Sequence, residues 1–101
     1  MNAPRRHPLA QADIEREARW YDAQKPGLGT DFVDEVKRVI GVIAEQPLRY
    51  STRFGHWRRA NLQRFPHAVY YQVIEGEPIV FAVLHAKRDH GPILETRRPT
   101  V

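Results

Sequence analysis

The hydrophobic positions of the chain change their spacing, from a helical period in the first half to a strand-like pattern in the second. Over residues 9–24 apolar side chains fall on one stripe of a helix, formed by Ala10, Ile14, Ala18 and Tyr21. A second stripe, at positions 32, 36, 39, 40 and 43, predicts another helix over residues 28–46. Residues 25–29 contain a Pro-Gly pair and predict a tight turn, so the two helices form an antiparallel hairpin.

Three segments with strand character follow this hairpin, at residues 57–65, 68–74 and 79–86. Pro66-His67 and residues 75–78 carry turn signals between them, which predicts an antiparallel meander. Strict alternation would put Ile79, Phe81, Val83 and His85 on one face of the last strand. Because both faces are apolar as far as His85, this strand is either central and covered on both sides, or keeps one face for a partner.

The remaining segments carry weak patterns. Residues 1–7 predict a poor first strand, since Pro4 removes a ladder donor and no apolar alternation is present. Residues 47–56 predict a basic loop without regular structure, and residues 91–101 an extended tail. The expected fold is therefore a single α+β domain over residues 1–101, in two layers. An antiparallel helical hairpin packs on a small antiparallel β-sheet, in the order β-α-α-β-β-β.

Charge is distributed unevenly along the 101 residues, which contain no cysteine and carry a net charge of +4. Residues 1–46 have a net charge of −1, and residues 47–101 a net charge of +5. The basic half favours a polyanion or an acidic peptide as partner, although a solvated arginine-rich surface explains it equally well. No apolar run approaches the roughly 20 residues that span a bilayer, so we expect a cytoplasmic protein without membrane contact.

Three motifs in a fixed order relate the chain to a known group. They read AxxDIExEARWYxxxxPGLGxxFxxEVxxVIxxIxxxP, RRxxLxRFPxxVYYxV and VxFAVLHAKRD, and extend over about residues 8–90. In this order the chain resembles the ParE/RelE superfamily of toxins from bacterial toxin–antitoxin modules, and most closely its ParE-like, plasmid-stabilisation branch. It departs from the family at the first strand, which is usually apolar, and at His7, where a capping Ser or Thr is common.

The resemblance implies a growth-inhibiting toxin that a cognate antitoxin, encoded beside it, holds in check. Members of the ParE branch are DNA gyrase poisons, and those of the RelE branch cut messenger RNA on the ribosome. We therefore expect a gyrase-poisoning toxin that is not an enzyme and forms a hetero-oligomer with its antitoxin. The alternatives are a RelE-like endoribonuclease, with ribosome and mRNA as partners, and a non-toxic relic that only binds antitoxin. An acidic, amphipathic antitoxin segment would pack on the helical hairpin and along the sheet.

Basic side chains near two strand ends are the candidates for chemistry under the ribonuclease alternative. Cleavage of RNA without metal needs a base, an acid and cations for the phosphorane charge. The catalytic candidates are Arg64, His85 and Arg88, with Lys87 beside them and Tyr70 or Tyr71 nearby. Two strands running the same way bring their ends together, so a shared basic rim is expected. The commoner role of a strand-end histidine is a hydrogen bond to backbone.

Other residues are expected to contact the target or the antitoxin. They are Arg58, Arg59, Lys87, Trp20 and Tyr21. For the arginines the competing interpretation is solvated edge charge, and for the aromatic residues it is the core, since two helices need a sheet to pack on. The five histidines show no metal-ligand spacing and the glycines form no phosphate-binding loop, so we expect neither a metal nor a cofactor.

Overall fold

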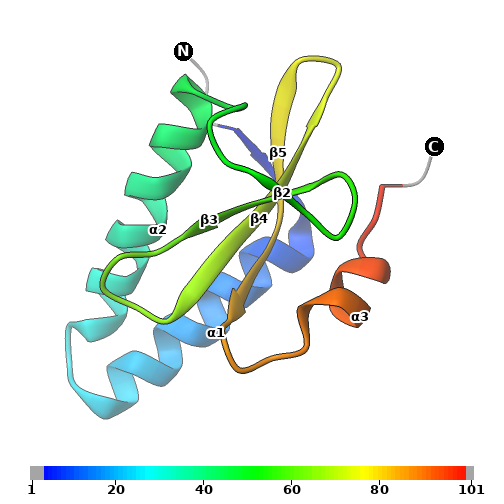
Figure 1. The fold of residues 1–101 in the computed structure, drawn as a ribbon. Helices are drawn as coiled ribbons and strands as arrows, with labels where there is room; N and C mark the ends of the chain where they lie inside the picture. The colour runs from blue at the N-terminus through cyan, green and yellow to red at the C-terminus, as the bar shows by residue number, and fades with distance from the viewer. Residues whose placement is uncertain (1–3, 100–101) are drawn as a thin grey trace.

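The computed structural model describes residues 4–99 and contains, within them, three helices and five strands (Figure 1). In chain order they are β1 (Arg5–Arg6), α1 (Pro8–Gln24), α2 (Leu28–Glu45), β2 (Thr52–Arg53), β3 (Trp57–Asn61), β4 (His67–Ile74), β5 (Glu77–His85) and α3 (His90–Glu95). None of the helices in this part of the chain combines the length and apolar character that crossing a bilayer requires.

The five strands form one sheet in the order β1-β5-β4-β3-β2, with α1 and α2 packed as an antiparallel hairpin on one face (Figure 1). This confirms the predicted α+β fold and the β3-β4-β5 meander. The sheet is mixed rather than wholly antiparallel, because β1 pairs with β5 in parallel. The segment expected to be an irregular loop also contributes β2, a two-residue edge strand.

The chain enters α1 directly from the short strand β1. The backbone N–H of His7 donates to the carbonyl of Val80 at 2.7 Å, which extends the pairing by one residue. His7 then acts as the N-cap, since its Nδ1 accepts a hydrogen bond from the N–H of Leu9 at 3.1 Å. Pro8 occupies the first helical position, where its missing N–H is not needed. His7 thus replaces the hydroxyl residue that is common at this cap.

Two glycines explain the tight turn between α1 and α2. Gly27 has a φ of +90°, a left-handed conformation that side chains rarely adopt. Gly29 lies against α1, where an added Cβ would collide with the carbonyl oxygen of Ala18 and with the Asp22 carboxylate. The N–H of Gly29 donates to that carboxylate at 2.7 Å. The Pro-Gly-Leu-Gly segment therefore sets both the turn and the close contact of the helices.

The larger hydrophobic core lies between the helical hairpin and the sheet. The stripe predicted for α2 is buried as expected, and it packs on the inward residues of the central strands β4 and β5. The main contributors are Phe32, Val36, Val39, Ile40 and Ile43 from α2, and Val69, Tyr71, Val80 and Val83 from the sheet. Burial of about a dozen apolar side chains is the main force holding the hairpin in place.

A smaller core covers the opposite face of the sheet, which we call the second face. Leu94 of α3 is fully buried there against Trp57, Tyr70, Phe81 and Leu84. The extended tail predicted for residues 91–101 is therefore wrong for residues 91–95, which belong to α3. A six-residue helix containing Gly91 and Pro92 has little intrinsic stability, so tertiary contacts form it. Of the two expectations for the last strand, a central strand covered on both sides is the one observed.

Asp13 of α1 connects the two covers of the sheet. Its carboxylate is fully buried and accepts hydrogen bonds from the N–H of Val83 at 2.9 Å and from both terminal nitrogens of Arg97. Arg97, just after α3, also donates to the carbonyl of Phe81 at 3.2 Å. A β-bulge at this point of β5 turns Phe81 and Ala82 both toward the second face, so strict alternation is wrong here.

Candidate functional site

A pocket opens where the C-terminal half of α1 meets the start of β4 and the end of β5, and we call it the α1 pocket. It has a volume of about 380 Å³ and is lined by Glu17, Trp20, Tyr21, Pro66, His67 and His85. Trp20 is 56% exposed at its rim, whereas Tyr21 packs inward against Phe32 and Phe65. The pocket brings together three of the residues predicted from the sequence, Trp20, Tyr21 and His85, which come from two distant segments of the chain.

The polar groups of the α1 pocket are a carboxylate and two histidines. Nε2 of His67 lies 3.2 Å from Oε1 of Glu17, and the His67 ring centroid is 5.0 Å from that of His85, its cross-strand neighbour. Burial lowers the pKa of His67, and the Glu17 carboxylate opposes this only in part. The neutral His67 ring donates from Nε2 to Glu17, which leaves Nδ1 as a buried acceptor without a hydrogen-bond partner.

His85 takes the structural role that is commoner for a strand-end histidine. Its Nδ1 accepts a hydrogen bond from the N–H of Lys87 at 3.0 Å, within the turn that follows β5. Nε2 therefore carries the proton in the neutral form of the ring, and the residue lines the α1 pocket. The carbonyl of His85 accepts from Nε2 of His90 at 2.7 Å. His85 thus supports the path from β5 to α3 and keeps one ring nitrogen available.

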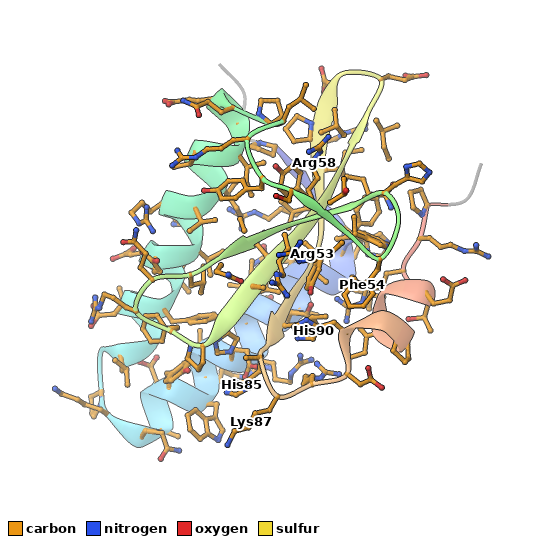
Figure 2. The ribbon with its side chains drawn as sticks, in the orientation of Figure 1. Arg53, Phe54, Arg58, His85, Lys87 and His90 are labelled. Carbon is orange, nitrogen blue, oxygen red and sulfur yellow. The ribbon has the colours of Figure 1, made fainter. Side chains whose placement is uncertain are left out.

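The second face carries a further depression, which we call the second-face groove. Its volume is about 400 Å³ and its lining residues include Arg59, Asn61, Ala68, Ala86 and His90. In Figure 2 the side chains of Arg53, Phe54 and His90 lie on this side of the sheet, toward α3. Phe54 is 58% exposed, in the turn between β2 and β3. Of the arginines, Arg59 lines this groove, and Arg53 is exposed on the same side of the sheet.

The two tyrosines named beside the catalytic candidates are fully buried and already bonded. The hydroxyl of Tyr70 lies 2.6 Å from Nδ1 of His90, and that of Tyr71 donates to the carbonyl of Pro47 at 2.6 Å. Burial raises the pKa of Tyr71, so its phenol stays protonated. Both tyrosines therefore serve the core, on opposite faces of β4, and neither presents a free hydroxyl to a substrate.

The predicted basic residues are not gathered in one contact. Arg64 pairs with Asp31 of α2 at 3.7 Å and lies over the Phe65 ring, whereas His85 packs against His67. Arg88 and Lys87 are exposed in the turn after β5. Lys87 lies beside His85 in Figure 2. In the described part of the chain, the side chains of Arg64 and His85 therefore make no direct contact, and they do not form the expected shared rim.

Arg58 and Arg59 lie on opposite faces of β3. Arg58 faces the helical side, where its Nη1 donates to the carbonyl of Tyr50 at 2.6 Å, while Arg59 lines the second-face groove. A surface that uses both arginines would have to wrap around the edge of the sheet. Because side chains alternate along a strand, the two arginines present their charges to opposite sides of the sheet.

Sequence reasoning missed Glu17, His67 and His90 as site residues. The register of β4 against β5 places His67 opposite His85. A prediction of that register from the sequence would have paired the two histidines. Glu17 lies one helical turn before Tyr21 and therefore on the same side of α1. The helical spacing of the sequence could have indicated this. His90 had no such signal, because its contacts depend on α3, which the sequence did not predict.

Comparison with known proteins identifies the family. The model of the family described as the ParE toxin of the type II toxin-antitoxin system parDE matches residues 5–90. Among solved structures, one titled as a chromosomal ParDE TA system from P. aeruginosa is similar with a TM-score of 0.74. It shares 16% sequence identity and covers 84% of this chain and 96% of its own, so it is evidence for the fold. No curated protein sequence matches. The resemblance seen in the motifs is thereby confirmed, and the chain belongs to the ParE toxin family of type II toxin–antitoxin systems.

Proposed function

We propose that this toxin acts in the cytoplasm by binding and poisoning DNA gyrase, and that a cognate antitoxin encoded beside it neutralises it in a hetero-oligomer. The observation that carries the proposal is that, in a chain of the ParE family, two tyrosines and one of the catalytic candidates are engaged in other contacts. Tyr70 and Tyr71 are buried with their hydroxyls bonded, and Arg64 pairs with α2. Such a set favours inhibition by binding over cleavage of RNA by the toxin itself.

A supercoiling assay tests the target. Purified toxin is added to gyrase and relaxed plasmid, and we expect supercoiling to stop and cleaved DNA to accumulate in a dose-dependent way. The purified antitoxin, added first, should abolish the effect. Gyrase that remains fully active at a large molar excess of toxin would exclude this target. Inducing the gene alone in a growing culture separates any toxin from a non-toxic relic, because a relic leaves growth unchanged.

The ribonuclease alternative has one observation in its favour, the two adjacent imidazoles of the α1 pocket. Histidines 5.0 Å apart beside a carboxylate provide the groups that acid–base cleavage of a phosphodiester uses. Primer extension on messages from an induced culture would then show discrete cuts. These cuts should disappear in the double variant Arg64→Ala and His85→Ala. Uncut messages in a growth-arrested culture would rule this alternative out.

A further inference from the structure

The α1 pocket contains a carboxylate without a cationic partner. The side chain of Glu17 is only 19% exposed, and its ion-pairing neighbour is His67. Because burial lowers the pKa of His67, that ring is neutral near pH 7 and supplies a hydrogen bond rather than a charge. Within residues 4–99, no lysine or arginine nitrogen lies within 4.0 Å of this carboxylate. A half-buried anion in a largely apolar pocket favours the entry of a cation.

The walls of the pocket suit a flat cation in particular. Trp20 and Tyr21 are nearly perpendicular, with ring planes at 84° and centroids 5.1 Å apart, and Trp20 exposes more than half of its surface. An exposed indole face attracts a guanidinium by cation–π contact and stacking. A carboxylate and an aromatic face match a ligand that only donates hydrogen bonds.

A metal ion is the competing cation for a site with two histidines and one glutamate. The described part of the chain, however, contains no group of three or more His, Asp or Glu side chains arranged to hold one. Nδ1 of His85 is also occupied by the N–H of Lys87. An arginine side chain fits better, since the pocket volume of about 380 Å³ admits it and its N–H groups can donate to the Glu17 carboxylate.

We propose that the α1 pocket binds the guanidinium of an arginine from the antitoxin, with Glu17 as its ion pair and Trp20 as its stacking partner. The inference deepens the proposed function, since it rests on an antitoxin being the physiological partner. Arginine is favoured over lysine because the guanidinium is planar, stacks on indole and donates in several directions at once. The pocket would then give the antitoxin one anchoring contact near the turn that joins the two helices of the hairpin.

The test measures binding of purified antitoxin to toxin by calorimetry. Glu17→Gln removes the charge but keeps an oxygen that accepts from His67, so the fold should persist, as circular dichroism and the thermal midpoint would verify. Glu15→Gln, at an exposed position of the same helix, is the matched control. We expect Glu17→Gln and Trp20→Ala each to weaken binding about tenfold or more, and Glu15→Gln to change it less than about twofold.

The antitoxin side of the contact is tested by replacing its arginines one at a time with alanine. One of these replacements should weaken binding to the unaltered toxin but should hardly change the affinity for the Glu17→Gln toxin. Lysine in place of that arginine should restore binding only in part. If Glu17→Gln binds the antitoxin with unchanged affinity, the inference is overturned. This holds also when Trp20→Ala weakens binding, because that result indicates an apolar occupant of the pocket. An antitoxin with no such arginine overturns it as well. If the unaltered toxin binds no antitoxin, the proposed partner fails with it.

Discussion

The two faces of the sheet are covered in different ways. On one face, α1 and α2 contribute 17 and 18 residues and bury the larger core. On the second face, α3 contributes six residues and one fully buried side chain, Leu94. The hairpin is held by many apolar contacts, whereas α3 needs the Asp13–Arg97 pair as well. A long amphipathic helix can thus be specified by its own pattern, while a short cover depends on a few specific contacts.

Both covers also rely on a buried carboxylate that accepts from a sheet-side backbone N–H. Asp13 accepts from the N–H of Val83, and Glu35 of α2 accepts from that of Gln63 at 2.7 Å, in the loop after β3. Each carboxylate also pairs with an arginine, and the two arginines differ in exposure. Arg97, the partner of Asp13, is buried, whereas Arg38, the partner of Glu35, is half exposed. An unpaired charge costs more free energy in a buried site than in an exposed one. Loss of the Asp13–Arg97 pair should therefore destabilise the fold more than loss of the Glu35–Arg38 pair.

The largest effect is expected from Asp13→Ala, which breaks the connection between the two covers. The substitution leaves the N–H of Val83 and the buried guanidinium of Arg97 without their acceptor. We expect a loss of about 3–5 kcal/mol in the free energy of unfolding. Urea denaturation followed by circular dichroism measures it, with Glu15→Gln on the same helix as the control. A loss under about 1 kcal/mol would show that the connection is dispensable.

Leu94→Ala and Ile43→Ala compare the two cores directly. Both side chains are fully buried, and each substitution should cost about 2–4 kcal/mol. Their hydrogen-exchange patterns should differ, because α3 can detach while the rest stays folded. We expect fast exchange confined to residues 90–97 for Leu94→Ala, and faster exchange throughout β4 and β5 for Ile43→Ala. Identical patterns would mean that both faces unfold together.

A smaller, pH-dependent effect is expected from Glu35→Gln. The Arg38 guanidinium donates two hydrogen bonds that lower the pKa of Glu35 to about 2, against a usual value of 4.5. A lowered carboxyl pKa stabilises the fold above pH 4.5, and this contribution is lost as the pH falls through about 2. At pH 7 the variant should lose about 1–2 kcal/mol. The difference between the two proteins should shrink on acidification; a constant difference down to pH 2 contradicts it.

The smallest effect is expected from Gly41→Ala on α2. An added Cβ meets no atom within 4 Å, so the methyl group would extend into solvent. Alanine should stabilise the helix by about 0.5–1 kcal/mol, because glycine loses more backbone entropy in a helix. The thermal midpoint should rise by a few degrees. The matched change Gly29→Ala should lower it, since that position touches α1.

The parts of the fold that a local pattern specifies could be predicted from the sequence. The helical stripes, the Pro-Gly turn and the three strands each depend on spacing within a short segment. Long-range pairing could not be predicted, because a contact such as Asp13 with Arg97 leaves no trace in periodicity. The bulge in β5 was invisible for the same reason, and it puts Phe81 and Val83 on opposite faces, whereas strict alternation had put them on one. Strand β1 was too short for any alternation to show.

The candidate site was predictable only in fragments. Trp20, Tyr21 and His85 were named as separate candidates, and the fold brings them into one pocket. Their partners Glu17 and His67 were missed, because a carboxylate on a helix and a histidine after a proline each have common structural roles. Arg64 shows the opposite case, where a residue type suited to catalysis is used to contact α2. Residue types alone therefore overestimate how many candidate site residues lie together in the folded protein.

The pairing of Asp13 with Arg97 has a consequence for synthesis. The two residues are 84 positions apart, so Arg97 is translated long after Asp13. As the chain grows from its N-terminus, Asp13 leaves the ribosome long before the arginine that neutralises it. Every nascent copy therefore passes through a stage in which Asp13 has emerged and the second face is still uncovered.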